Sequence, residues 1–425
     1  MKTKIYNYYL YILHILVFVS CYLNSAKLCA YLIKLSLFRQ KDLNKKIYNK
    51  KITLVLYRAI GERDIRIVQK SSKKVPQIFY MRRATVKLIF YFFSNKRKFF
   101  FNYLKPGLYL SEDDYFNQTE KEKKRLELFW TNVILNLKKL HKNKISSIVT
   151  FNFSYFAEVA LYAGCKKNNL PVKLWFKECF RSDPEIKNFV KKNKFGHVFQ
   201  FIQKISVYNK FIKNALIAID KSNSKKIEVN GCPRIYDYIN KKKYDKKIKD
   251  ILFLSFHLKG GISSDKNKNL SWKLSYDKTI KLLNELSNNK NLNINIKRKK
   301  SRPINTRYKI NKKIKIFDEG SAHKYIQQAD IIIGHNSAST IEALINGKHV
   351  LIPFFENKKI LKKYLFNFNK EIIYNSEKKM KMKILVLINK KTMFPLKDTK
   401  NQKTINKYYG SSKNIIKKYE NFLTY

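Results

Sequence analysis

Acidic residues are scarce in this sequence. Only 30 of its 425 residues are Asp or Glu, against 90 Lys and Arg, which leaves a formal net charge of +60. Arginine is rare among the basic residues, whereas a nucleic-acid-binding protein would favour its bidentate fork. The charge is therefore better explained by drift towards AT-rich codons than by a nucleic-acid partner. The field that it creates would still hold the chain near an anionic membrane surface.

Cysteine, proline and glycine are also few. The five cysteines form no CxxC pair and have no zinc-site spacing with histidine, so we expect reduced thiols and no metal site. The 8 prolines and 11 glycines argue against a disordered or fibrous chain. There is no Walker loop, no GxGxxG and no Ser–His–Asp order, which removes the common nucleotide and hydrolase motifs.

Charge is absent from residues 5–26, which are rich in Tyr, Leu, Ile, Val and Phe. As a helix this stretch could span a bilayer of about 30 Å. It could equally lie in the membrane interface as a helix or hairpin, or pack against the following domain. If the helix spans the bilayer, the greater number of lysines after the stretch than before it places the rest of the chain in the cytoplasm. We therefore expect association with the cytoplasmic face of the inner membrane.

From residue 52 onward, short β-branched runs alternate with helical stretches, a pattern typical of parallel α/β sheets. The order indicates a hydrophobic segment (1–50), a first Rossmann-like domain (51–240), a second one (241–405) and a final helix (406–425). In the first domain we expect strands at 52–57, 76–81, 145–151, 171–176, 215–220 and 225–232, helices at 119–142, 156–168 and 202–213, and a polar turn at 58–64. A Lys-rich linker, 241–249, separates the domains.

The most informative segment is residues 329–353, in which an apolar run ends at Gly334 and a helical stretch follows. Ser337, Ser339 and Thr340 can cap this helix. The helix start offers free N–H groups and a positive dipole end, which suit a diphosphate. Glu342, in the first turn, could accept both hydroxyls of a ribose. The same pattern also fits an ordinary capped helix after a strand, with no ligand.

This segment resembles the donor-nucleotide segment of two-Rossmann-domain (GT-B) glycosyltransferases. It is similar to undecaprenyl-linked N-acetylglucosaminyltransferases, CDP-glycerol glycerophosphotransferases, hydrolysing UDP-N-acetylglucosamine 2-epimerases and, above all, surface-carbohydrate and capsule biosynthesis proteins. In these relatives a small or hydroxyl residue binds phosphate, and a Glu five residues before a Gly binds ribose. The matching residues here are Ser337, Ser339 and Thr340, and Glu342 before Gly347.

Two weaker similarities occur in the same order as in these relatives. Residues 229–234 resemble a V-x-G-x-P-R element at the entrance to the second domain and end in Arg234. Residues 294–297 resemble a strand that supplies a cation near the diphosphate, here Lys297, although Arg298 and Lys299 depart from the usual pattern. The resemblance covers roughly residues 145–355. Gly260 lies in a Gly-rich turn that could wrap a phosphate or be an ordinary turn between strand and helix. His323, at a helix start, lies in a region that touches the base or the phosphate in these relatives.

The resemblance implies a GT-B fold with two doubly wound domains facing a cleft, and a transferase that needs no cofactor beyond its nucleotide-activated donor. A sugar or polyol phosphate would pass to a lipid- or glycan-linked acceptor in capsule or lipopolysaccharide synthesis. Catalysis would be metal-independent, with cations and the helix start neutralising the leaving diphosphate. Inverting transfer needs a general base in the first domain, and the candidates are Glu62, Asp64 and Glu178.

Two other functions stay open. A nucleotide-sugar 2-epimerase of the non-NAD type would act on the free donor, and it would have no use for the apolar N-terminus. A basic nucleic-acid- or membrane-binding protein without catalysis would have the charge but not the donor site, and the rarity of Arg argues against nucleic acid as a partner.

Overall fold

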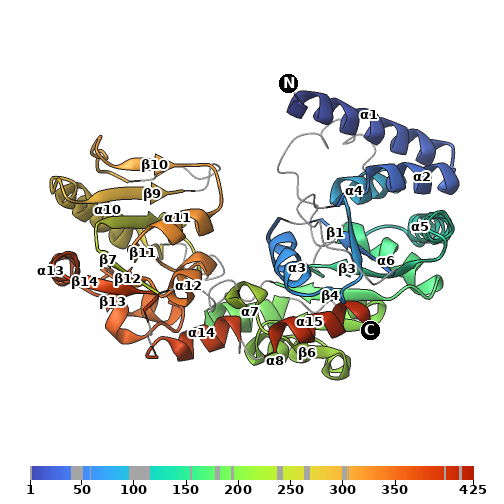
Figure 1. The fold of residues 1–425 in the computed structure, drawn as a ribbon. Helices are drawn as coiled ribbons and strands as arrows, with labels where there is room; N and C mark the ends of the chain where they lie inside the picture. Colours follow the sequence, from blue (N-terminus) through green and yellow to red (C-terminus); the bar gives the residue numbers. More distant parts are fainter. Residues whose placement is uncertain are drawn as a thin grey trace.

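The computed structural model describes residues 2–39, 51–57, 59–94, 115–153, 156–177, 182–192, 196–236, 243–262, 269–298, 304, 306–396, 399–410 and 414–425. Two parallel six-stranded sheets form the framework, each flanked by helices (Figure 1). Their strands are largely buried, as is usual for parallel sheets covered by helices. The prediction of two doubly wound α/β sheets is confirmed.

The first sheet has the order β2-β1-β3-β4-β5-β6. All its strands are parallel, and the order in which the chain adds strands reverses between β1 and β3. Its strands are β1 (Ile52–Leu56), β2 (Gln77–Met81), β3 (Ile145–Thr150), β4 (Val172–Phe176), β5 (Lys204–Val207) and β6 (Ile227–Val229). The accompanying helices are α3 (Ala59–Ser71), α4 (Arg83–Phe93), α5 (Glu120–Leu140), α6 (Val159–Lys167), α7 (Asp183–Lys192) and α8 (Lys210–Ile219).

The second sheet has the order β10-β9-β8-β11-β12-β13. Its strands are β8 (Asp250–Leu254), β9 (Asn293–Lys297), β10 (Lys315–Phe317), β11 (Ile331–Ile333), β12 (His349–Pro353) and β13 (Ile373–Tyr374). Its helices are α10 (Lys273–Leu286), α11 (Ala322–Gln328), α12 (Ala338–Ile345) and α13 (Glu377–Ile388). Counted along the chain, the order is 3-2-1-4-5-6, the arrangement of dinucleotide-binding sheets, and it reverses between β8 and β11.

The C-terminal tail returns to the first domain. Helix α14 (Gln402–Tyr409) leads into α15 (Ile415–Thr424), which lies along the first domain (Figure 1). Tyr419 of α15 stacks on Trp175 of β4 with ring centroids 3.9 Å apart. The Lys173 ammonium donates a hydrogen bond to the Phe422 carbonyl at 2.8 Å. The last helix is therefore part of the first domain's core, although it follows the whole of the second domain in sequence.

Four local expectations from the sequence are wrong. Residues 215–220 were expected as a strand, but they end α8, whose first turn is capped by the Asn209 side chain. The helix expected at 202–213 is also wrong in its first part, because residues 204–207 form β5. The described part of the polar turn expected at 58–64, residues 59–64, is instead the start of α3. The expected linker contains β7 (Tyr244–Lys247), which pairs antiparallel with β14 (Lys391–Phe394).

The N-terminal apolar segment forms a hairpin of α1 (Lys2–Tyr22) and α2 (Ala26–Ser36). Ser25 caps α2 by accepting a hydrogen bond from the Leu28 amide at 3.3 Å. Phe18 of α1 meets Phe92 of α4 edge-on, with centroids 5.1 Å apart, and Lys34 of α2 donates to a carbonyl at the end of α5. Among the residues that the structure describes, no helix combines the length and apolarity needed to cross a membrane.

Candidate functional site

The reversal of strand order in the second sheet marks its expected ligand site. Ligands of open α/β sheets bind outside the carboxyl ends of the strands at such a point. Here the chain leaves β8 into the turn around Gly260 and leaves β11 at Gly334. The two loops touch, because a Cβ placed on Gly261, whose φ is +83°, would lie 2.9 Å from Asn336 Nδ2. Glycine is needed there for both conformation and space.

Close packing joins the end of β11 to α12. A Cβ on Gly334 would lie 2.5 Å from Thr340 Oγ1, so strand and helix can approach only with glycine at this position. The Ser337 hydroxyl caps the helix by accepting a hydrogen bond from the Thr340 amide at 3.3 Å. Thr340 is fully buried, whereas Ser337 and Ser339 are half-buried. Of the three predicted phosphate-binding residues, Ser337 and Ser339 are thus the accessible ones.

His335 lies at the same point of the sheet, directly after Gly334. Its ring stacks on Phe256 and packs against Trp272, with centroids 4.5 Å away in each case. The side chain is buried, and this burial lowers the pKa of His335 to about 3. Within the described structure neither ring nitrogen has a hydrogen-bond partner. The imidazole is therefore neutral at physiological pH, with two unused polar atoms at the expected ligand site.

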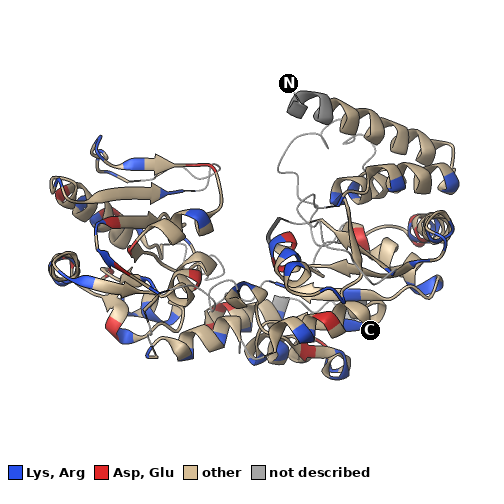
Figure 2. Ribbon diagram, in the orientation of Figure 1, with Lys and Arg blue, Asp and Glu red and all other residues tan. Residues whose placement is uncertain are grey.

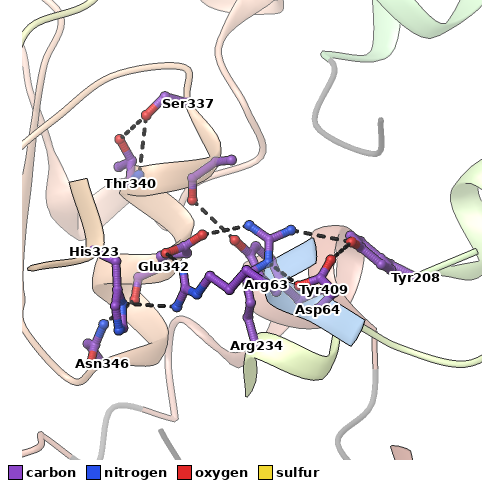
Figure 3. A network of polar contacts seen from close by, with 11 residues as sticks. Arg63, Asp64, Tyr208, Arg234, His323, Ser337, Thr340, Glu342, Asn346 and Tyr409 are labelled. Carbon is purple, nitrogen blue, oxygen red and sulfur yellow. Dashed lines mark hydrogen bonds and ion pairs between the residues drawn. The ribbon is translucent and has the colours of Figure 1, made fainter. Parts of the chain in front are cut away.

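Glu342 has a different environment from the one expected for a ribose-binding residue. Its Oε1 lies 2.6 Å from Arg234 Nη1, and its Oε2 lies 3.1 Å from Arg63 Nη1 (Figure 3). Arg63 comes from α3 and Arg234 from the segment after β6, so both partners belong to the first domain. The carboxylate therefore joins the carboxyl ends of the two sheets.

The ion pairs continue into the first domain. Arg234 Nε lies 2.9 Å from Asp64 Oδ1, and the Tyr208 hydroxyl donates a hydrogen bond to the other oxygen of Asp64 (Figure 3). The Tyr409 ring of α14 lies 5.3 Å from the Arg234 guanidinium. We call these residues, Arg63, Asp64, Tyr208, Arg234, Glu342 and Tyr409, the interdomain network.

The interdomain network is nearly dry and balanced in charge. Two guanidinium groups face two carboxylates, and the side chains of Arg234, Asp64 and Glu342 are at most 7% exposed. Burial alone would raise the pKa of Glu342, but the pairs with Arg234 and Arg63 outweigh it and lower this pKa to about 2. Burial raises the pKa of Asp64, although Arg234 and Tyr208 act in the opposite direction.

The other predicted donor-site residues are scattered around the second sheet. The Lys297 ammonium donates to the carbonyls of Arg298 at 2.6 Å and Asp318 at 2.9 Å, and it is buried. A phosphate there would have to replace these carbonyls. His323 Nδ1 lies 3.0 Å from Arg63 Nη2, beside the interdomain network. Gly260 lies in the turn after β8, and its carbonyl accepts a hydrogen bond from the Trp272 indole at 2.6 Å.

The three candidate bases have three different positions. Glu62 lies in the first turn of α3, is half-buried and pairs with Arg66 at 3.9 Å. It also contributes, after burial, to raising the pKa of Tyr57. Asp64 is completely buried in the interdomain network, so an acceptor hydroxyl could reach it only if the network opened. Glu178 lies outside the described residues.

Sequence reasoning missed Arg63, Tyr208 and Tyr409. For Tyr208 and Tyr409 the sequence carries no signal, because both read as ordinary core aromatics. For Arg63 the sequence does carry a signal. In a chain whose basic residues are mostly Lys, an Arg indicates a position where the planar guanidinium group matters.

No model of a protein family matches the chain, and no curated protein does. Solved structures similar to it include the UDP-GlcNAc 2-epimerase of Methanocaldococcus jannaschii (14% identity, 84% of this chain and 98% of that one, TM-score 0.45). Others are the UDP-GlcNAc 2-epimerase of Neisseria meningitidis bound to UDP-GlcNAc (12%, 88% and 99%, TM-score 0.47) and the wall teichoic acid polymerase TagF (11%, 99% and 97%, TM-score 0.45). UDP-GlcNAc 2-epimerases are thus both among the similar structures and among the families that the sequence motifs resemble.

Proposed function

We propose that the protein transfers a sugar or polyol phosphate from a nucleotide-activated donor to an acceptor hydroxyl, with the nucleotide bound between β8 and β11. The main support for this proposal is the position of α12 relative to the second sheet. Its capped, glycine-backed start lies at the reversal point of a sheet with the 3-2-1-4-5-6 order. A helix start at this point binds phosphate through its N–H groups and dipole.

The diphosphate would lie at Ser337 and Ser339, and the nucleoside would extend along α12 towards Glu342. Both oxygens of Glu342 are already in ion pairs, but the two partners differ in accessibility. The Arg63 side chain is 26% exposed, whereas that of Arg234 is 4% exposed. Ribose hydroxyls would therefore replace Arg63 at Oε2 and leave the Arg234 pair intact. Arg63 would then turn from Glu342 to the diphosphate.

In the proposed reaction an acceptor oxygen attacks the anomeric carbon, or the phosphorus of a polyol phosphate donor. The bond from that atom to the nucleotide's phosphate oxygen breaks, and the bond electrons leave with the nucleotide. Glu62, half-buried in the first turn of α3 after β1, would take the acceptor proton. Arg63 and the start of α12 would stabilise the leaving phosphate without a metal. A lipid- or glycan-linked acceptor, as in surface polysaccharide synthesis, would approach from the first domain.

Thermal-shift measurements on the full chain with UDP, CDP, GDP and CMP test the nucleotide site. We expect one nucleotide to raise the melting temperature of the wild type and of Ser339→Gln. Ser339→Glu should lose this response, because its carboxylate repels phosphate. The carboxylate also suits the first turn of a helix, so the variant should fold normally.

Equal responses of Ser339→Glu and Ser339→Gln would place the nucleotide elsewhere. Product analysis after incubation with a nucleotide sugar, in the absence of any acceptor, separates the proposed transfer from 2-epimerisation. Conversion of the donor into its epimer under these conditions would overturn the transferase.

A further inference from the structure

Helix α1 has two apolar sides. One side packs into the first domain through Leu13, Val17 and Cys21, which are 0–3% exposed. The other side follows the same helical spacing, and its members are exposed. They are Tyr8, Tyr11, Ile12, Ile15, Leu16, Val19 and Tyr22, together with Leu23 directly after the helix, between 38% and 75% exposed. A helix that is apolar all round is normally covered on every side, and here no described residue covers the outer one.

Helix α2 extends this surface with Leu28, Tyr31 and Leu35, which are 37–50% exposed. We call the exposed residues of α1 and α2 the hairpin face. More than half of the exposed large hydrophobic side chains in the described structure lie in residues 8–35. Single exposed apolar residues are ordinary, but so many on two adjacent helices indicate a surface that binds something.

We propose that the hairpin face docks on an anionic lipid bilayer, with α1 and α2 lying in the interface and the face inserted among the acyl chains. Charge favours this occupant: residues 1–41 contain no Asp or Glu, and Figure 2 shows no acidic residue on the described part of the hairpin. Basic residues are spread through the same stretch, at Lys2, Lys4, Lys27, Lys34, Arg39 and Lys41. Juxtamembrane lysines attract anionic headgroups.

The aromatic composition of the hairpin face also fits a lipid interface. Five exposed side chains of the hairpin are tyrosines, whose rings favour the boundary between headgroups and acyl chains. They are Tyr8, Tyr9, Tyr11, Tyr22 and Tyr31, each 44% exposed or more. A second copy of the chain is a poorer occupant, because two molecules with a net charge of +60 and acid-free hairpins repel each other.

The hairpin is fixed to the first domain, through the Phe18–Phe92 contact and the hydrogen bond from Lys34 to the Leu140 carbonyl. It lies at the side of this domain away from α15 (Figure 1). Docking would therefore orient the whole first domain on the bilayer and leave the tail and the interdomain network away from it. This inference goes beyond the proposed function and holds whatever the reaction is.

Co-sedimentation of the full chain with lipid vesicles tests the docking. We expect binding to phosphatidylcholine vesicles that contain phosphatidylglycerol, and much weaker binding to phosphatidylcholine alone. The variant Ile12→Ser/Leu16→Ser removes two neighbouring members of the hairpin face and should weaken binding at least about tenfold. Both positions are exposed, so the fold should not change.

The matched control is Met382→Ser/Val386→Ser, an equally spaced exposed pair on α13, which should bind vesicles like the wild type. Equal binding of the two double variants would overturn the proposal. So would wild-type binding that does not depend on phosphatidylglycerol, or no vesicle binding at all. Self-association that is lost in Ile12→Ser/Leu16→Ser, without vesicle binding, would identify a second copy as the occupant.

Discussion

At the scale of single residues, Arg234 is the cation on which the interdomain network depends. Replacing it in Arg234→Met would leave Asp64 without an ion-pair partner in a fully buried position and Glu342 with Arg63 alone. Removing one member of a buried ion pair costs about 3–5 kcal/mol. We expect a loss of unfolding free energy in this range, measured by urea titration.

The matched variant is Arg63→Met. Arg63 is partly exposed, and Glu342 would keep Arg234, so a loss of only about 1 kcal/mol is expected. Equal losses in the two variants would show that the charge balance around Arg234 does not hold the domains together.

His335 makes stability depend on pH. Its pKa is about 3 in the folded protein and about 6.5 in the unfolded chain, so between these values the unfolded state binds the extra proton. The free energy of unfolding should therefore fall as the pH drops below about 6.5, by up to about 1.4 kcal/mol per unit, until pH 3. At higher pH the histidine contributes no such dependence.

The variant His335→Phe keeps an aromatic ring between Phe256 and Trp272 but cannot titrate. We expect its stability to exceed that of the wild type by a margin that grows from pH 6.5 to pH 4. Chemical denaturation at a series of pH values measures this margin, and other histidines cancel in the comparison. A constant margin would mean that His335 is protonated or solvated in the folded protein.

The sequence predicted the importance of Glu342, Arg234 and Asp64 one at a time, each for a different role. It could not predict that they contact one another. Glu342 is 108 residues from Arg234 and 279 from Arg63, and an ion pair over such distances leaves no trace in local spacing. The helix cap at Ser337, by contrast, involves neighbours in sequence and was predictable.

At the scale of elements, the contact between β11 and α12 has little tolerance. In Gly334→Ala the new Cβ would lie 2.5 Å from Thr340 Oγ1, so the helix start must move. Overpacking of this kind costs about 1–3 kcal/mol. We expect a lower melting temperature and weaker nucleotide binding together, because the displaced element is the proposed phosphate site.

The second variant, Gly334→Ala/Thr340→Ala, removes the clashing hydroxyl and should recover part of the stability. Calorimetry of the single and double variants, with Thr340→Ala alone as reference, gives the coupling between the two positions. Additive effects would show that the strand end and the helix start do not touch as the structure has them.

Elements were predictable where helical or strand periodicity ran uninterrupted, as in α5 and the segment from β11 to β12. The errors occurred where the residues fit more than one kind of element. Residues 215–220 are apolar and β-branched enough to resemble a strand, and the signal that decides for a helix is the cap at Asn209. Strand β7 looked like a charged linker, because its residues are mostly exposed and its partner β14 lies far along the chain.

At the scale of the whole molecule, the tail ties the two halves together. Alternating strands and helices in the sequence indicated two sheets, but periodicity carries no information about where a last helix docks. The structure places α15 on the first domain. The Asn209 side chain of that domain donates a hydrogen bond from Nδ2 to the carbonyl of Tyr408 in α14 at 2.9 Å. Tyr409, also in α14, donates to the Ala338 carbonyl at the start of α12. The tail therefore contacts both domains.

This arrangement predicts that the two domains unfold together. Tyr419 is completely buried, stacks on Trp175 and donates a hydrogen bond to the Gly231 carbonyl at 2.9 Å. Tyr419→Ala should cost about 3–5 kcal/mol, as for other large aromatic deletions in a core, and should release α15 from the first domain.

In calorimetry we expect one transition for the wild type and two for Tyr419→Ala, with the first domain melting earlier. Tyr425→Ala, at a position 78% exposed, should leave the single transition unchanged. Two transitions in the wild type would mean that the tail does not couple the unfolding of the two domains.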